Sequence, residues 1–221
     1  MKTLELVITD FCNLSCNNCG QGTPWHKTKQ NMSMDYLREI SDYFEPHEFE
    51  HIKISGGEPT LFREFDTFCS ELQTLFPAKA YSMATNGKKL KKYLDDIKVF
   101  NWIDLSRYPG LNDKEFDELL ALEIPNVKYF EKHDGEEMMD IRIFPNYEKK
   151  NIFNKCSWPK DIYKIVQDRI YPCCIAFGLT TIRNDEKLSE DKLGVILDHH
   201  WRENLQKLNI EFACKQCWVP V

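Results

Sequence analysis

Hydrophobic and polar positions along the first two thirds of the chain form a repeating pattern, in which short apolar runs are followed by longer amphipathic stretches. This pattern is typical of βα units around a parallel sheet. The apolar runs predict six strands, at residues 4–9, 51–55, 79–84, 102–106, 127–131 and 140–144. The stretches between them predict four helices, at residues 33–44, 62–76, 88–97 and 112–122.

Two of these helices carry start signals. Ser33 is the expected N-cap of the first, because a short polar side chain there can accept a hydrogen bond from a free backbone N–H. Asn112 and Glu115 resemble a capping box at the start of the fourth.

The predicted elements are too few for a closed (β/α)8 barrel, which needs about 250 residues. Residues 133–139, between the fifth and sixth strands, are also too few for a crossover helix. We therefore expect an α/β fold, with a partial TIM-like barrel of five or six βα units over residues 1–150.

The alternation stops after a polar stretch at residues 145–153, which places a domain boundary near residue 150. Residues 151–221 predict a small second domain, consisting of a β-hairpin at 162–171 with its turn at Asp168, a polar loop and a helix at 198–208. Such a unit has little core of its own, and a bound metal could supply the missing stability.

The net charge and the length of the apolar runs exclude some classes of binding partner. A net charge of -6 and a pI near 5.6 argue against extended nucleic-acid binding, which needs a basic surface. No apolar run approaches the roughly 20 residues of a membrane span. We expect a cytoplasmic protein that acts on a small molecule, with no membrane partner.

Cysteines carry the main chemical signal. Eight of the nine fall into two zones, at residues 12–19 and 156–217. The cytosol disfavours structural disulfides, so two such zones indicate metal or thiol chemistry. Cys69 stands alone on an apolar helix face and is expected to be a core residue.

The first zone, Cys12, Cys16 and Cys19, follows the first predicted strand, at the end of a barrel where active sites are built. A [4Fe-4S] cluster normally takes four thiolates, so three on one loop leave one iron open. A zinc site with His26 as fourth ligand is the alternative. The spacing Cys-x3-Cys-x2-Cys resembles the radical S-adenosylmethionine (SAM) superfamily.

That resemblance implies that SAM chelates the open iron and is cleaved reductively to a 5'-deoxyadenosyl radical, which abstracts a hydrogen atom from the substrate. Reduced flavodoxin or ferredoxin would supply the electron. The family often has an aromatic residue near the adenine just before the third cysteine, where this chain has Asn18.

A second motif, Gly56-Gly57-Glu58-Pro59, follows the second predicted strand. The glycines permit close backbone approach, Glu58 presents a negative charge and Pro59 fixes the exit of the chain. In the family this turn binds the SAM amino group. Thr85 and Asn86 after the third strand, and Ser106 and Arg107 after the fourth, resemble further SAM-contacting positions. Ser106 or Arg107 could hold the methionine carboxylate, and the alternative for each is an ordinary turn residue.

The second cysteine zone resembles a twitch domain, a shortened SPASM domain that holds an auxiliary cluster. The resemblance implies one auxiliary [4Fe-4S] cluster, with Asp168 at the hairpin position where the family pattern has glycine. Its expected ligands are Cys156, Cys173, Cys214 and Cys217, although Cys174 could replace Cys173. A zinc site with four thiolates is the alternative.

Several functions are compatible with these motifs. The first is a SAM-dependent dehydrogenase of a small substrate, similar to the alcohol dehydrogenases of aminoglycoside pathways. A radical epimerase or isomerase would need a hydrogen-atom donor such as Cys174 or Cys69, and peptide modification is a third possibility. A non-enzymatic electron carrier or zinc-binding module gives the Gly-Gly-Glu-Pro turn no purpose. Candidate pocket residues at strand ends are Tyr108, His133, Glu136, Arg142 and Tyr147.

Overall fold

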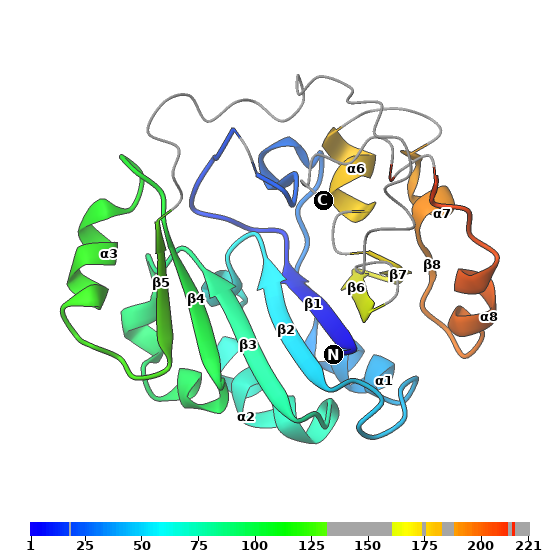
Figure 1. The fold of residues 1–221 in the computed structure, drawn as a ribbon, viewed down its shortest axis with the longest axis horizontal. Helices are drawn as coiled ribbons and strands as arrows, with labels where there is room; N and C mark the ends of the chain where they lie inside the picture. The colour runs from blue at the N-terminus through cyan, green and yellow to red at the C-terminus, as the bar shows by residue number, and fades with distance from the viewer. Residues whose placement is uncertain (18, 132–160, 174–175, 183–187, 212–213, 215–221) are drawn as a thin grey trace.

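In the part of the chain that the structure describes, the strands form one open sheet of eight (Figure 1). The computed structural model of the chain describes residues 1–17, 19–131, 161–173, 176–182, 188–211 and 214. The strand order is β5-β4-β3-β2-β1-β6-β7-β8. The strands are β1 (Thr3–Thr9), β2 (His51–Gly56), β3 (Ala80–Thr85), β4 (Trp102–Arg107), β5 (Val127–Glu131), β6 (Ile162–Val166), β7 (Arg169–Tyr171) and β8 (Val195–Ile196).

The sheet has a parallel part and an antiparallel part. Strands β5 to β1 and then β6 are parallel, whereas β7 and β8 are antiparallel to their neighbours. The first five predicted strands are confirmed, as is the partial TIM-like α/β fold. The sixth predicted strand, 140–144, and the predicted boundary near residue 150 lie outside the described residues.

The C-terminal hairpin extends the barrel sheet. Strand β6 pairs along the free side of β1 from Thr3↔Ile162 to Val7↔Val166. Strand β1, which leads into the loop with Cys12, Cys16 and Cys19 (the cysteine loop), therefore lies between β2 and β6. The hairpin predicted for the second domain thus belongs to the same sheet as the strands of the first domain.

The α-helices of the described residues are α1 (Met34–Ser41), α2 (Phe65–Leu75), α3 (Asp113–Leu120), α6 (Ala176–Ile182), α7 (Glu190–Leu193) and α8 (Trp201–Gln206). Ser33 is confirmed as the cap of α1, since its Oγ accepts a hydrogen bond from the backbone N–H of Tyr36 at 3.1 Å. The predicted helix at 88–97 is wrong. That segment forms two short 3-10 helices, η3 (Leu90–Tyr93) and η4 (Asp96–Val99), each held by one buried residue, Leu90 and Ile97 respectively.

Two further short 3-10 helices, η1 (Thr23–Trp25) and η2 (Pro59–Leu61), lie in the loops after β1 and β2. The sequence did not predict α6, α7 or β8, which occupy the expected polar loop. Helix α6 contains a glycine and two threonines, residues of weak helix propensity, so its helical form depends on packing.

Strand β1 is buried along its whole length and divides its side chains between the two faces of the sheet. Leu4, Leu6 and Ile8 belong to the main core with residues of α1 and α2, which lie with α3 on the outer side of the sheet. Val7 belongs to a second cluster that includes Tyr171 and residues of α6. Glu5 lies on the same face as Val7, and its carboxylate is buried there.

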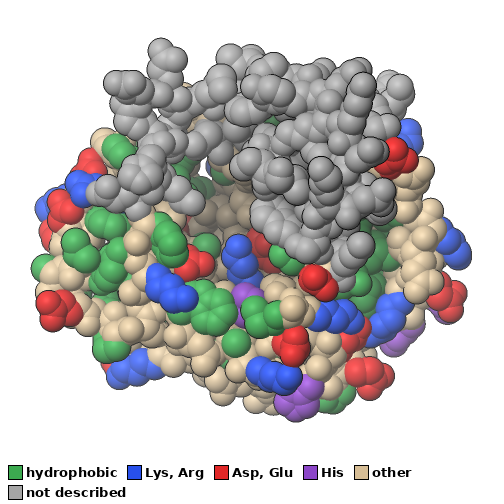
Figure 2. All heavy atoms as spheres, in the orientation of Figure 1, with side chains coloured by type: hydrophobic (Ala, Val, Ile, Leu, Met, Phe, Trp, Pro, Cys, Tyr) green, Lys and Arg blue, Asp and Glu red, His purple; other side chains and the backbone are tan. Residues whose placement is uncertain are grey.

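The opposite side of the molecule is hollowed. Figure 2 shows a depression near the centre of this face, where acidic and basic side chains gather. Among the helices that the structure describes, none combines the length and the apolar run needed to cross a bilayer.

Candidate active site

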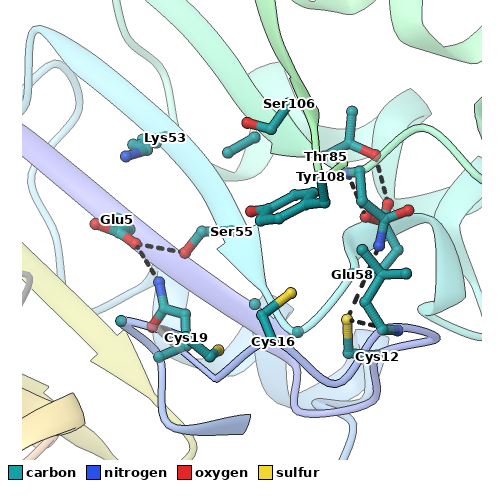
Figure 3. A pocket seen from close by; sticks show the side chains of 17 residues that line it. Glu5, Cys12, Cys16, Cys19, Lys53, Ser55, Glu58, Thr85, Ser106 and Tyr108 are labelled. Atoms are coloured by element: carbon teal, nitrogen blue, oxygen red, sulfur yellow. Dashed lines mark hydrogen bonds between the residues drawn. The ribbon is translucent and has the colours of Figure 1, made fainter. Parts of the chain in front are cut away.

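A cavity of about 360 Å³ opens at the carboxyl ends of β1 to β4 (Figure 3). Because the carboxyl ends of parallel strands meet at one edge, the loops after these strands converge there. Nine of the residues predicted from sequence motifs line this one cavity: Cys12, Cys16, Cys19, Gly56, Gly57, Glu58, Thr85, Asn86 and Ser106.

The two glycines let the cysteine loop lie against the end of β2. The backbone N–H of Gly57 donates to the carbonyl of Thr9, and that of Glu58 donates to the carbonyl of Phe11, both at 2.8 Å. A Cβ added at Gly57 would lie 2.4 Å from the carbonyl oxygen of Phe11. At Gly56, where φ is +152°, it would lie 2.4 Å from the carbonyl oxygen of Thr9. The backbone that approaches these glycines is therefore that of the cysteine loop itself.

Glu58 joins the end of β2 to the end of β3. Its Oε1 accepts hydrogen bonds from the hydroxyls of Thr85 at 2.5 Å and Thr60 at 2.6 Å, and its Oε2 accepts one from the backbone N–H of Asn86 at 2.7 Å. The side chain is fully buried, and burial raises the pKa of Glu58 although these donors oppose the shift. The carboxyl group thus fixes the shape of the cavity at its glycine end.

Asn112 connects the loops that follow β3 and β4. The prediction that it caps α3 as part of a capping box is wrong. Its side chain makes no cap bond to α3. Instead its Oδ1 accepts from the backbone N–H of Tyr108 at 2.6 Å, while its Nδ2 donates to the carbonyls of Asn86 at 2.6 Å and Ser106 at 2.8 Å. A single buried amide therefore joins the ends of β3 and β4.

The three thiols line one side of the cavity (Figure 3). Cys16 is buried, whereas Cys12 and Cys19 are half-buried. Burial raises the pKa of the Cys12 thiol, and the backbone N–H of Leu14 opposes the shift from 3.4 Å. Within the described ranges, no three His, Cys, Asp or Glu side chains converge on the position of a single metal ion. Three thiolates that each bind a different iron of a cluster do not need such convergence.

His26, the fourth ligand of the zinc alternative, is engaged elsewhere. Its Nε2 lies 3.0 Å from the carbonyl of Gln21, and its Nδ1 lies 3.7 Å from Oδ1 of Asp10. Its ring also contacts the ring of Phe177 edge-on. The geometry therefore does not favour zinc in the first cysteine zone.

Three predicted residues lie away from the cavity lining. The guanidinium of Arg107 pairs with Asp113 at 2.8 Å, so Ser106 is the better placed of the two candidates for a carboxylate. Pro59 begins η2 beneath the turn. Cys69 is buried in the main core, which agrees with its expected packing role and separates it from the cavity.

Sequence reasoning missed a polar end of the cavity. Glu5, Gln21, Lys53 and Ser55 line it in addition to the predicted residues, and Tyr108, a candidate from sequence, lies between the two ends (Figure 3). The available signal was the presence of charged residues at inward positions of otherwise apolar strands. Of the other candidates, His133, Glu136, Arg142 and Tyr147 lie outside the described residues.

The second cysteine zone is only partly described. Cys173 and Cys214 both pack against the second hydrophobic cluster, whereas Cys156, Cys174 and Cys217 lie outside the described residues. Helix α6 links this region to the cysteine loop, because a Cβ added at Gly178 would lie 2.3 Å from the carbonyl oxygen of Gly20.

Comparison with known proteins agrees with this geometry. Residues 6–108 match the family model described as the radical SAM superfamily. A GTP 3',8-cyclase from Edwardsiella ictaluri (strain 93-146) is 32% identical over 92 residues, which are 40% of this chain and 28% of that protein. A GTP 3',8-cyclase from Actinobacillus pleuropneumoniae serotype 3 (strain JL03) is 33% identical over 95 residues, covering 42% of this chain and 28% of that protein.

The crystal structure of BtrN in complex with AdoMet and 2-DOIA superposes with a TM-score of 0.68 at 16% identity, over 98% of this chain and 86% of that one. This likeness shows a shared fold. The cyclases, in contrast, match over less than a third of their own length. Over residues 6–108 this chain is therefore similar to the radical SAM superfamily, a family whose cofactors are a [4Fe-4S] cluster and SAM.

Proposed function

We propose that this protein is a radical SAM enzyme that abstracts a hydrogen atom from a small substrate, with dehydrogenation as the overall reaction. The observation that carries the proposal is the meeting of Cys12, Cys16 and Cys19 with the Gly-Gly-Glu turn in one cavity. When bound, the cluster and SAM supply a one-electron cleavage of SAM and the carbon radical that removes the hydrogen atom.

The residues of the site fit these cofactors. In this proposal the three thiolates hold the cluster. The close approach of the Phe11 backbone to Gly57 keeps their loop against the end of β2. Glu58 provides negative charge beside the ammonium group of SAM and keeps Thr85 and Asn86 in place. The hydroxyl of Ser106 lies in the lining, available to the methionine carboxylate.

Oxidation of an alcohol removes two electrons, one with the abstracted hydrogen atom and one afterwards, together with a proton. An auxiliary [4Fe-4S] cluster on Cys156, Cys173, Cys214 and Cys217 would accept the second electron. Two observations support its proximity to the first cluster: Cys173 and Cys214 pack on one hydrophobic cluster, and α6, which belongs to the same cluster, abuts the cysteine loop. Reduced flavodoxin or ferredoxin would deliver the first electron.

The test uses the full chain, reconstituted anaerobically with iron and sulfide. Two clusters correspond to about eight irons per chain. With dithionite and SAM, we expect release of 5'-deoxyadenosine and methionine, measured by mass spectrometry. Cys12→Ala should abolish this release while the auxiliary cluster remains, whereas Cys214→Ala should lose auxiliary iron and still cleave SAM.

The matched control is Cys69→Ala, which removes a buried thiol away from the cavity. It should keep the iron content and SAM cleavage of the wild type. If Cys12→Ala protein releases 5'-deoxyadenosine as fast as the wild type, the assignment of the site is wrong.

A further inference from the structure

Three charged side chains, those of Glu5, Lys53 and Lys164, come from neighbouring strands of the sheet, and Glu5 and Lys53 lie at the end of the cavity away from Glu58 (Figure 3). Glu5 of β1 is paired in register with Lys53 of β2 on one side and with Lys164 of β6 on the other. Glu5 is 2% exposed and Lys164 is fully buried. Buried charges are expensive to desolvate, so such a group beside a cavity indicates a functional requirement. The proposed cluster and SAM ligands do not include these three residues.

The hydrogen bonds of Glu5 are distributed unevenly between its two oxygens. Its Oε1 receives the hydroxyl of Ser55 at 2.5 Å, the amide of Gln21 at 3.3 Å and the ammonium of Lys164 at 3.5 Å. Lys164 also donates to the side-chain oxygen of Gln21. No described residue donates to Oε2, and Glu5 lines the cavity (Figure 3). Oε2 of Glu5 is therefore an acceptor that the bonds to Oε1 hold in place and that a ligand in the cavity can use.

The charge of this acceptor is fixed. Burial alone would raise the pKa of Glu5, but Lys164, Lys53 and the bonds from Ser55 and Gln21 outweigh it and lower that pKa to about 2. The carboxylate thus stays ionised at any physiological pH and cannot serve as a general acid.

Charge also limits the class of ligand group. Lys164 and Lys53 already supply the positive partners of the Glu5 carboxylate, so its free oxygen does not require a cation. An anionic group has no proton to donate to Oε2. A neutral hydroxyl satisfies both requirements, because its O–H can donate to Glu5 while its oxygen accepts from the ammonium of Lys53. The neighbouring lining residues Ser55, Ser106 and Tyr108 also carry neutral hydroxyls.

We propose that Glu5, together with Lys53, binds a hydroxyl group of the substrate, and that the substrate is a neutral polyhydroxylated small molecule. This inference rests on the proposed function, since it takes the other end of the cavity as the SAM site. Glu5 and Lys53 would then set which carbon of the substrate faces that end.

The test measures binding to the reconstituted full chain in the presence of SAM, by calorimetry. The probes are myo-inositol (neutral), glucosamine (cationic), gluconate (anionic) and cyclohexanol, which has a single hydroxyl. We expect myo-inositol to bind more tightly than the other three. Glu5→Gln should weaken myo-inositol binding by about 10- to 100-fold, the usual effect of losing a hydrogen bond to a charged group. Glu50→Gln, at an exposed glutamate paired with Lys79, is the control and should change nothing.

A second variant separates binding from mere folding. Lys164→Met removes the buried cation beside Glu5 and should shift the preference between glucosamine and myo-inositol toward glucosamine, by about tenfold in the ratio of affinities. A purely structural role for Glu5 would leave this ratio unchanged. Absence of myo-inositol binding to the wild type, or equal binding by Glu5→Gln protein, overturns the proposal.

The two proposals fail in different ways. Glu5→Gln protein should retain its iron and its slow substrate-independent release of 5'-deoxyadenosine, because Glu5 is not placed at the SAM end. Wild-type protein that cleaves SAM but binds no polyol would refute the role of Glu5 alone. Wild-type protein that releases no 5'-deoxyadenosine would refute the proposed function whatever it binds.

Discussion

A methyl group added at Gly57 tests how closely the cysteine loop must approach β2. In Gly57→Ala the new Cβ would lie 2.4 Å from the carbonyl oxygen of Phe11, 2.6 Å from its carbon and 2.9 Å from the carbonyl oxygen of Asp10. All three are backbone atoms, so no side-chain rotation relieves the contact. The loop that carries Cys12 must move away from the sheet.

The energetic cost follows from this displacement. Overpacking of this kind costs about 1–3 kcal/mol. Moving the loop also lengthens the two 2.8 Å hydrogen bonds that Gly57 and Glu58 donate to it, each of which contributes about 0.5–1.5 kcal/mol. A total loss of about 2–6 kcal/mol is a large share of the roughly 5–15 kcal/mol that stabilise a typical protein.

The assay compares Gly57→Ala with Gly110→Ala. Gly110 has φ of +75° and nothing within 4 Å of an added Cβ, so its substitution brings only the left-handed strain of about 1–2 kcal/mol. Urea unfolding of the metal-free proteins should show the larger loss at Gly57. After reconstitution, Gly57→Ala should also bind less iron and SAM, whereas Gly110→Ala should match the wild type. Equal stability and equal iron content in the two variants would refute the reasoning.

Three further predictions test other parts of the structure. Asn112→Asp removes the two donors to the carbonyls of Asn86 and Ser106, and should cost about 2–3 kcal/mol in urea unfolding and weaken SAM binding; unchanged SAM affinity would contradict the bracing role. Gly178→Ala forces α6 away from the cysteine loop and should lower stability by about 1–3 kcal/mol and reduce iron content after reconstitution; a fully loaded, stable variant would disprove that contact. Burial, aided by the positive charge of Lys53, lowers the pKa of His51 to about 4 in the folded protein. Between pH 6.5 and 4 the His51 ring is therefore protonated in the unfolded chain but not in the folded one, so acidification over this range should destabilise the metal-free protein. His51→Gln should flatten the unfolding free energy over that pH range, and an unaltered slope would exclude His51 as its source.

The sequence was informative where the site depends on local spacing. The thiols of the first zone and the glycine turn are each encoded within eight residues, and the strands before them were visible as apolar runs. Parallel β1 and β2 then necessarily bring the two motifs to one edge. The motif residues of the cavity could be predicted for this reason.

Features that depend on pairing between distant segments could not be predicted. Glu5 is a single acidic residue in an apolar run, and nothing near it in the chain shows that Lys53 and Lys164 lie on either side. Asn112 has the spacing of a helix cap, yet the carbonyls of two neighbouring strands compete successfully for its amide. Helix α6 contains a glycine and two threonines, which weaken its intrinsic helix propensity, and tertiary contacts stabilise it.

The position of β6 beside β1 has a consequence for biogenesis. Thr3 pairs with Ile162, so during synthesis one edge of β1 stays unpaired until β6 (Ile162–Val166) has left the ribosome. Closing so long a loop is entropically unfavourable, and contacts of such sequence separation form slowly. The cysteine loop extends from this incomplete strand, and the helix that presses against it, α6, is made later still. If Cys12, Cys16 and Cys19 hold the cluster as proposed, its assembly should therefore wait until α6 has been made and packs against their loop.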